Sequence, residues 1–286
     1  MTWVFIRVFF SVAVFGAVLT QASDLSQAED RYKHTDFEAS LTLLDKHSSD
    51  AATNFLVARN YFMLGDFKKA AEYLQSATTQ QPASSEYMDW LGRAYGKRAE
   101  SSNPLIAPSL ASKARQAFEK AVDLDPRNAD ALSDLFDFYL EAPGFLGGGY
   151  DKALAIAERT SKFDPAQGYF EEAKLAQKRK EFQTAEDHLR QAIGVAPHSV
   201  GHLLALGRFL ANQGRNKESD AVFLEARTKH PNAPQVLFAW ASVLVNQKRD
   251  LPHAKTMLEN YMQASLTPDD PPKHEARRLL KEADGA

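Results

Sequence analysis

Five prolines recur along the middle of the chain, each at the end of an apolar, alanine-containing or hydroxyl-rich segment. The segments read SATTQQP, KAVDLDP, RTSKFDP, QAIGVAP and EARTKHP, and they end at Pro82, Pro126, Pro165, Pro197 and Pro231. Successive prolines are 44, 39, 32 and 34 residues apart. A base period of 34 explains these distances if the second unit has ten extra residues, the third has five, and the fourth is two short. Such a period predicts a stack of small supersecondary units.

Small and apolar residues recur inside the units at helical spacing. In residues 51–84, the unit that ends at the first of these prolines, the pattern is Tyr61, Gly65, Ala70, Leu74, Ala77 and Pro82. The small residues that let a first helix approach a second are Ala58, Gly92, Ala173, Gly207 and Ala241. The alanines that do the same from the second helix are Ala70, Ala114, Ala153, Ala185 and Ala254. We expect each proline to end a second helix, because it lacks an N–H donor and clashes with the preceding turn.

This pattern resembles the tetratricopeptide-repeat family over about residues 25–283. The resemblance implies an all-α fold, a right-handed α-solenoid of about six antiparallel helix pairs plus a C-terminal capping helix. A single domain over 23–286 is expected. Its units are about 25–50, 51–84, 85–128, 129–167, 168–199, 200–233 and 234–264, and the capping helix is 271–283. The first pair is degenerate, as terminal repeats are when one face meets water.

The N-terminal residues differ from the rest. Arg7 precedes an uncharged apolar run from Val8 to Leu19, which has the length of a signal-peptide core, and small residues follow it. We predict a signal peptide over 1–22, cleaved after Ala22, and a periplasmic or secreted protein. The alternative is an uncleaved membrane anchor in which Arg7 reaches the interface. The sequence has no cysteine, which excludes disulfides and a lipid-modified export signal.

The stretch EAPGFLGGGYDKA, residues 141–153, has the glycine density of a phosphate-binding loop. Gly144 and Gly149 have the separation of such a loop, but Tyr150 and Asp151 stand where lysine and a hydroxyl residue are required. The preceding segment is helical rather than a strand. We therefore interpret the glycines as a widened turn between the two helices of the third unit.

Two enlarged turns are expected to carry apolar pairs on the same edge of the solenoid. Phe145 and Leu146 lie in the glycine-rich turn, and Leu105 and Ile106 lie in the ten-residue expansion of the second unit. We expect Phe145 and Leu146 to tuck under a neighbouring helix, with display to a partner as the alternative. The two turns are candidates for packing on each other.

Other signals of chemistry are weak. His198 and His202 are four residues apart but lack an evident third metal ligand, so both are interpreted as surface histidines. The HEARR segment at His274 lacks the second histidine of a zinc-protease motif, and no G-x-S-x-G motif occurs. The formal net charge of −3 does not favour nucleic-acid binding. We predict no catalytic residues, no metal and no cofactor.

In the family that the sequence resembles, the inner helices line a concave face that binds extended peptides or partner helices. The residues at groove positions predict pockets that pair an apolar side chain with a cation. The predicted partner-binding residues are Phe55, Arg59, Arg93, Phe170, Lys174, Leu204 and Arg208. They favour a protein or peptide partner with apolar anchors and carboxylates, including the free C-terminus of a polypeptide. A solvated helix surface is the simpler alternative.

The third unit presents Asp130, Asp134 and Asp137 on its inner helix, which departs from the chaperone-tail clamp of some family members. The sequence therefore favours a non-enzymatic interaction scaffold or assembly factor of the cell envelope. Two alternatives remain open. One is an enzyme or small-ligand-binding module that uses the enlarged turns, and the other is a self-associating structural protein.

Overall fold

The structure is a computed structural model that describes residues 24–44 and 50–285, and all of its regular elements are helices. Residues 24–33 are helical. The remaining elements are α2 (Phe37–Leu43), α3 (Ala51–Met63), α4 (Phe67–Gln80), α5 (Ser85–Ser101), α6 (Ala107–Leu124), α7 (Ala129–Glu141), η1 (Gly144–Leu146), α8 (Tyr150–Thr160), α9 (Pro165–Lys178), α10 (Phe182–Val195), α11 (Val200–Asn212), α12 (Asn216–Lys229), α13 (Pro234–Asn246), α14 (Leu251–Gln263) and α15 (Lys273–Gly285). The all-α prediction is confirmed. The predicted signal peptide, 1–22, lies outside the described residues.

The helices from α3 to α14 pack as successive pairs, with α15 against the last pair. Four of the five prolines follow the end of a second helix, after α4, α6, α10 and α12, as expected. Pro165 differs, because it is the first residue of α9. Proline is tolerated there, since the first N–H of a helix has no intrahelical acceptor. The helix before it, α8, has 11 residues where α4 has 14, so α8 ends without a proline.

The seam inside each pair depends on the small residues that the sequence pattern identified. Ala58, Ala173 and Ala241 are completely buried. At Gly92 a Cβ atom would lie 2.5 Å from the ring of Phe118, and at Gly207 it would lie 2.9 Å from the ring of Phe223. These glycines are therefore required by the close approach of an aromatic ring from the second helix.

The turn inside several pairs needs a left-handed residue two positions after the first helix ends. Glycine meets this need at Gly65 (φ 81°) and Gly214 (φ 73°), where an L side chain would be strained. Lysine occupies the same position at Lys180 (φ 62°) and Lys248 (φ 53°). The backbone conformation therefore repeats from unit to unit while the residue type varies.

Replacing Lys180 with glycine is expected to raise the free energy of unfolding by about 0.5–1 kcal/mol. The left-handed conformation costs an L residue about 1–2 kcal/mol, and the flexibility of glycine in the unfolded state offsets part of the gain. Urea denaturation of the wild type and the Lys180→Gly variant measures the difference. The reverse change, Gly65→Lys, should lower the unfolding midpoint, and a neutral result for both would contradict this account of the turn.

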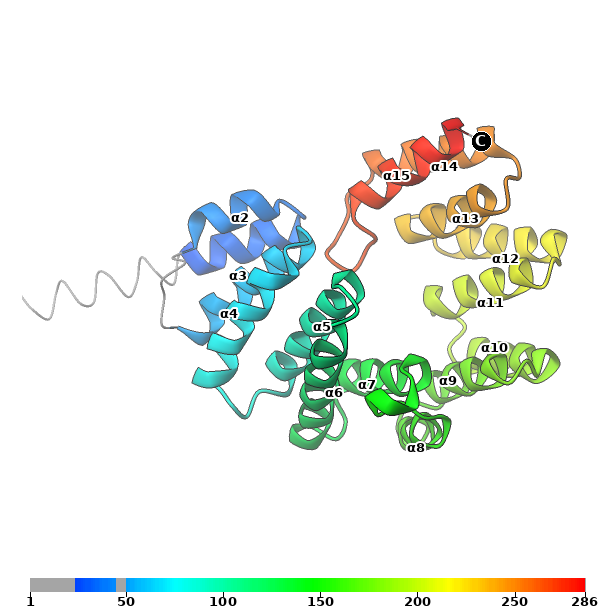
Figure 1. Cartoon of the computed structure of the whole chain (residues 1–286). Coiled ribbons are helices and arrows are strands. Elements are labelled where there is room, and N and C mark those ends of the chain that lie inside the picture. Colours follow the sequence, from blue (N-terminus) through cyan, green and yellow to red (C-terminus); the bar gives the residue numbers. More distant parts are fainter. Residues whose placement is uncertain (1–23, 45–49, 286) are drawn as a thin grey trace, which may run out of the picture.

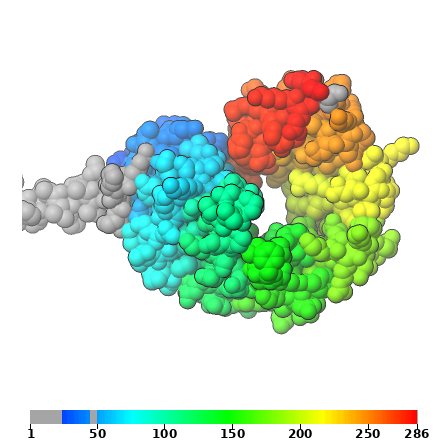
Figure 2. Space-filling view, in the orientation of Figure 1, coloured from blue at the N-terminus to red at the C-terminus, as the bar shows by residue number. Residues whose placement is uncertain are grey.

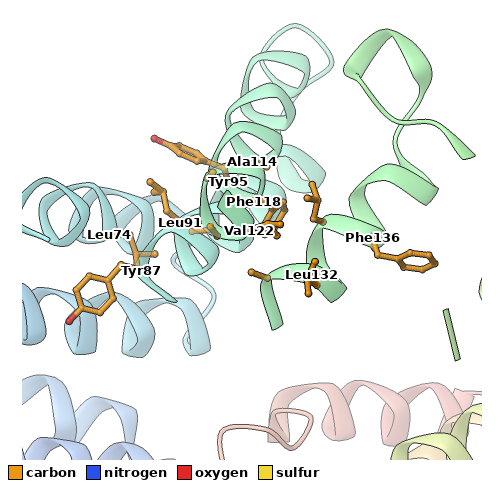
Figure 3. Packing of buried hydrophobic residues seen from close by; sticks show 14 of the residues in the cluster. Leu74, Tyr87, Leu91, Tyr95, Ala114, Phe118, Val122, Leu132 and Phe136 are labelled. Atoms are coloured by element: carbon orange, nitrogen blue, oxygen red, sulfur yellow. The ribbon is translucent and has the colours of Figure 1, made fainter. Parts of the chain in front are cut away.

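The pairs stack in sequence order around a nearly closed curve (Figure 1). Their apolar side chains form a seam that passes from one unit to the next. Figure 3 shows part of this seam, where Leu91 of α5, Phe118 of α6 and Leu132 of α7 belong to one cluster. Successive odd-numbered helices contact each other, as α3 does α5 and α11 does α13. The odd-numbered helices therefore line the inner, shorter side of the curve.

The two ends of the curve approach each other around a central opening (Figure 2). A pocket of about 680 Å³ lies between them, lined by Tyr32 and Arg59 from the N-terminal end and by residues 267–269 from the loop before α15. The inner face is thus the wall of an almost closed ring. A partner reaches it by passing through the opening or by opening the ring.

Candidate functional site

All seven predicted partner-binding residues lie on inner helices: Phe55 and Arg59 on α3, Arg93 on α5, Phe170 and Lys174 on α9, and Leu204 and Arg208 on α11. Their environments differ, and the differences separate the cations into two groups.

Arg59 is held by aromatic rings rather than by a carboxylate. Its guanidinium carbon lies 4.3 Å from the ring centroid of Tyr32, 5.1 Å from that of Trp90 and 5.5 Å from that of Phe55. Its Nε donates a hydrogen bond to the Tyr32 hydroxyl, 3.2 Å away. No carboxylate of the described residues forms an ion pair with it. Such a cation offers its terminal N–H groups to a carboxylate that enters the pocket.

Phe55 shapes the same pocket while being largely buried itself. It is 8% exposed, and its ring stacks on Tyr87 with the centroids 4.3 Å apart. Phe55, Arg59 and Tyr87 all line the 680 Å³ pocket between the two ends of the curve, together with Asp269. The apolar residue and the cation predicted for this unit therefore do lie side by side.

Arg93 has a different environment, because carboxylates surround it. Its guanidinium forms ion pairs with Asp134 of α7, with Asp89 one turn earlier on α5 (3.0 Å) and with Asp130 of α7 (3.8 Å). Burial and the negative charge of Asp134 raise the pKa of Asp89 to about 8. Burial also raises the pKa of Asp134. Arg93 consequently joins the second unit to the third instead of presenting a free charge.

Lys174 is also engaged within the protein. Its ammonium group pairs with Asp137 of α7 and lies 5.6 Å from the ring centroid of Phe170. One turn later, Lys178 pairs with Glu141 at 2.8 Å. The acidic inner surface of α7 is therefore largely neutralised by cations from α5 and α9.

Arg208 is exposed on α11, and within residues 24–44 and 50–285 it has no hydrogen-bond or ion-pair partner. Desolvation lowers its pKa. Leu204, one turn earlier, is 5% exposed and belongs to the core between α11 and α13. Arg208 thus presents a cation on the opposite arm of the curve from Arg59 (Figure 1).

His202 is a residue whose environment the sequence misjudged. The prediction of two surface histidines holds for His198, which is exposed, and is wrong for His202, which is 8% exposed. Its ring lies 5.7 Å from that of Phe170, so burial lowers its pKa. The apolar residues at helical spacing from His202 along α11 could have indicated that this histidine is buried. His202 fills the space between α9 and α11.

The glycine-rich turn has the structural role that the sequence indicated. Gly147 has φ 94°, and a Cβ at Gly148 would lie 1.9 Å from the carbonyl oxygen of Ala142. Lys152, the lysine nearest to the loop, donates a hydrogen bond to the carbonyl oxygen of Gly147 at 2.8 Å. The glycines therefore allow a tight reversal of the backbone, and the lysine closes it.

The predicted tucking of the apolar turn residues is wrong for Phe145, which is 82% exposed, while Leu146 is half-buried. Leu105 is 92% exposed and Ile106 is 51% exposed, so the two pairs do not bury each other. Phe145 is therefore exposed rather than tucked under a neighbouring helix.

Within the described part of the protein, no group of three or more histidine, aspartate or glutamate residues could hold a metal ion. None of the helices formed by these residues is long and apolar enough to cross a membrane.

A ring of antiparallel helix pairs, with charged and aromatic side chains along its inner face, defines an α-solenoid of the protein-interaction class. The profile of the tetratricopeptide repeat matches residues 25–95 and 170–234. Residues 25–95 and 170–234 therefore carry tetratricopeptide repeats. Proteins with this repeat are generally non-enzymatic, and its fold generally mediates protein–protein interaction.

Solved structures share the fold. A tetratricopeptide repeat protein from Parabacteroides merdae is 12% identical, with a TM-score of 0.58 over 93% of this chain and 99% of that chain. A thermophilic protein of the same family from Thermus thermophilus is 19% identical, with a TM-score of 0.55 over 66% of this chain and 98% of that chain. Among curated proteins no sequence matches.

Proposed function

We propose that the inner face binds an extended segment of a partner protein, with carboxylates of the partner pairing with Arg59 and Arg208. The observation that carries this proposal is the contrast among the predicted cations. Arg93 and Lys174 already pair with carboxylates of α7, whereas no carboxylate of the described residues pairs with Arg59 or Arg208. A cation left without a counter-charge inside a concave wall is suited to an anionic ligand.

The ring also restricts the form of the partner. The ends of the curve come close together around a central opening (Figure 2), an arrangement that favours an extended segment over a folded domain. An extended segment or a free polypeptide end passes through the opening and meets one cation on each arm. The pocket beside Arg59 is walled by the rings of Tyr32, Phe55 and Tyr87, which suit an apolar side chain of the partner. Its lining also includes Lys33 and the carboxylates of Glu29, Glu86 and Asp269, so the carboxylate of the partner pairs with Arg59 itself.

The predicted signal peptide indicates the compartment in which we expect this interaction to occur. If residues 1–22 direct export, the protein and its partner meet in the periplasm or outside the cell, and the role is that of an envelope scaffold or assembly factor. An uncleaved N-terminal segment would tether the same solenoid to the membrane.

We expect the Arg59→Glu/Arg208→Glu double variant to retain partner proteins from an envelope extract at least about 10-fold less well than the wild type. Each charge-assisted hydrogen bond contributes about 1.5–3 kcal/mol, and reversal of the charge adds repulsion. Affinity capture with quantitative mass spectrometry measures the loss.

The matched control is Lys120→Glu/Arg227→Glu, which changes the net charge equally at exposed positions on the outer helices α6 and α12. It should retain the same proteins as the wild type. Equal capture by the wild type and the Arg59→Glu/Arg208→Glu variant, with both folded by circular dichroism, would contradict the proposal.

A further inference from the structure

The two enlarged turns carry the most exposed large apolar side chains of the described residues, Leu105 at 92% and Phe145 at 82%. Scattered exposed leucines are ordinary on a protein surface, but a concentration of them marks an interaction site. The second of these turns contains η1, which contacts α6, the helix that follows the first turn. In Figure 2 the α7–α8 turn, in bright green, stands on the face toward the viewer.

A hollow lies beside these protruding side chains. It has a volume of about 700 Å³, and its apolar lining includes Phe62, Phe118, Phe138 and Leu146. We call it the turn pocket. Leu146, which lines it, is the residue after the exposed Phe145. An apolar protrusion and an apolar hollow therefore adjoin on the same face of the solenoid.

The rim of the turn pocket carries charges that are already balanced. Lys97 pairs with Glu100 at 2.9 Å, Arg93 with Asp134, Asp137 with Lys174, and Glu141 with Lys178. Such a rim gives no unpaired charge to a charged ligand. It also does not repel a surface that bears the same charges, which is the condition for association with an identical copy.

We propose that this face is a symmetric dimer interface, in which Phe145 of each copy enters the turn pocket of the other. A two-fold axis between a protrusion and an adjoining hollow creates two identical contacts at once, and the assembly closes at two copies. The proposal does not depend on the inner face, since the variants that test it leave Arg59 and Arg208 unchanged.

A membrane surface is the other candidate for exposed apolar turns. The hollow argues against it, because a bilayer would cover the protruding side chains and leave the turn pocket without an occupant. The balanced rim argues against it as well, since attraction to anionic lipids needs unpaired cations.

The experiment is sedimentation equilibrium of the full-length protein over about a 100-fold range of concentration. The wild type should dimerise with rising concentration. Phe145→Asp, which removes the protrusion, should weaken the dimer at least about 100-fold, because each dimer loses two buried rings. Gly96→Leu should have the same effect. Gly96 lines the turn pocket with no atom within 4 Å of a Cβ placed there, so a side chain added at this position enters the hollow.

Mixing the two variants provides the sharpest test. Phe145→Asp keeps an open pocket and Gly96→Leu keeps its protrusion, so a mixed pair makes one of the two contacts and should associate, more weakly than the wild type. Leu224→Asp, on the outer helix α12 where the side chain is 57% exposed, is the control and should dimerise normally. A wild type that remains monomeric, a Phe145→Asp variant that dimerises like the wild type, or a monomeric wild type that co-sediments with anionic phospholipid vesicles overturns the proposal.

Discussion

Replacing Gly92 with alanine is expected to lower the free energy of unfolding by about 1–3 kcal/mol, although alanine is the better helix former. The new Cβ would lie 2.5 Å from two atoms of the Phe118 ring, which is only 6% exposed. The ring cannot move freely, because it packs against Phe138 with the centroids 6.4 Å apart. Accommodation therefore requires α5 and α6 to separate. Urea denaturation followed by circular dichroism measures the change.

Gly96, one turn later on α5, is the matched control. No atom lies within 4 Å of a Cβ placed there, so Gly96→Ala should raise the free energy of unfolding by about 1 kcal/mol through helix propensity alone. The two variants thus make the same chemical change in the same helix with opposite expected signs. If both stabilise the protein, the close approach of Phe118 does not limit the packing of this pair.

The contrast between these two glycines shows what a repeat pattern reveals. The repeat pattern identified Gly92 as a position where two helices meet, because a small residue stands at the corresponding place in other units, as Ala58, Ala173 and Gly207 do. It did not reveal which aromatic ring fills the space. The backbone repeat determines where two helices come close together. Which side chain packs at that place depends on its rotamer and on the neighbouring unit.

The inner face illustrates the same limit. The register placed Arg93 and Lys174 on inner helices, and it also identified Asp134 and Asp137 on α7 as an acidic surface. Whether these charges pair was not evident, because Arg93 and Asp134 are 41 residues apart and belong to different units. The pairing depends on the distance between inner helices, which the curvature of the stack sets. The repeat pattern therefore predicts which residues lie on the inner face, but it does not predict which of the cations there pair with carboxylates.

The enlarged turn of the third unit, residues 142–149, was predicted in place but not in side-chain direction, and its glycines indicated an unusual backbone. For the second unit the prediction of a ten-residue turn is wrong, because most of the extra residues lengthen α5 and α6, which have 17 and 18 residues where α3 and α4 have 13 and 14. The direction of Phe145 follows from details such as the approach of Gly148 to the carbonyl oxygen of Ala142, which no periodicity encodes. Likewise, Pro165 keeps its place in the period while it starts α9 instead of ending α8.

The buried carboxyl of Asp89 predicts a stability that falls as pH rises. Its side chain is 2% exposed, and burial with the nearby charge of Asp134 raises its pKa to about 8 in the folded protein, from about 3.9 in the unfolded state. The folded state therefore binds a proton that the unfolded state has released between about pH 4 and pH 8. Glu171, 1% exposed with its pKa raised to about 7 by burial, acts in the same direction. The linked stability is fully present below about pH 4 and is lost as pH rises through these folded-state pKa values.

Asp89→Asn should remove much of this dependence, because asparagine imitates the neutral carboxyl. We expect the free energy of unfolding of the variant, relative to that of the wild type, to increase by about 2–4 kcal/mol from pH 5 to pH 9. Arg93 keeps Asp134 and Asp130 as partners, so the change leaves no unpaired buried cation. Urea denaturation of both proteins at the two pH values gives the difference, in which the titration of surface histidines cancels. Asp130→Asn is the control, since that carboxylate is in the same cluster but 81% exposed, and it should follow the wild type. Identical pH profiles for the wild type and Asp89→Asn would show that the buried carboxyl is charged throughout, held so by Arg93.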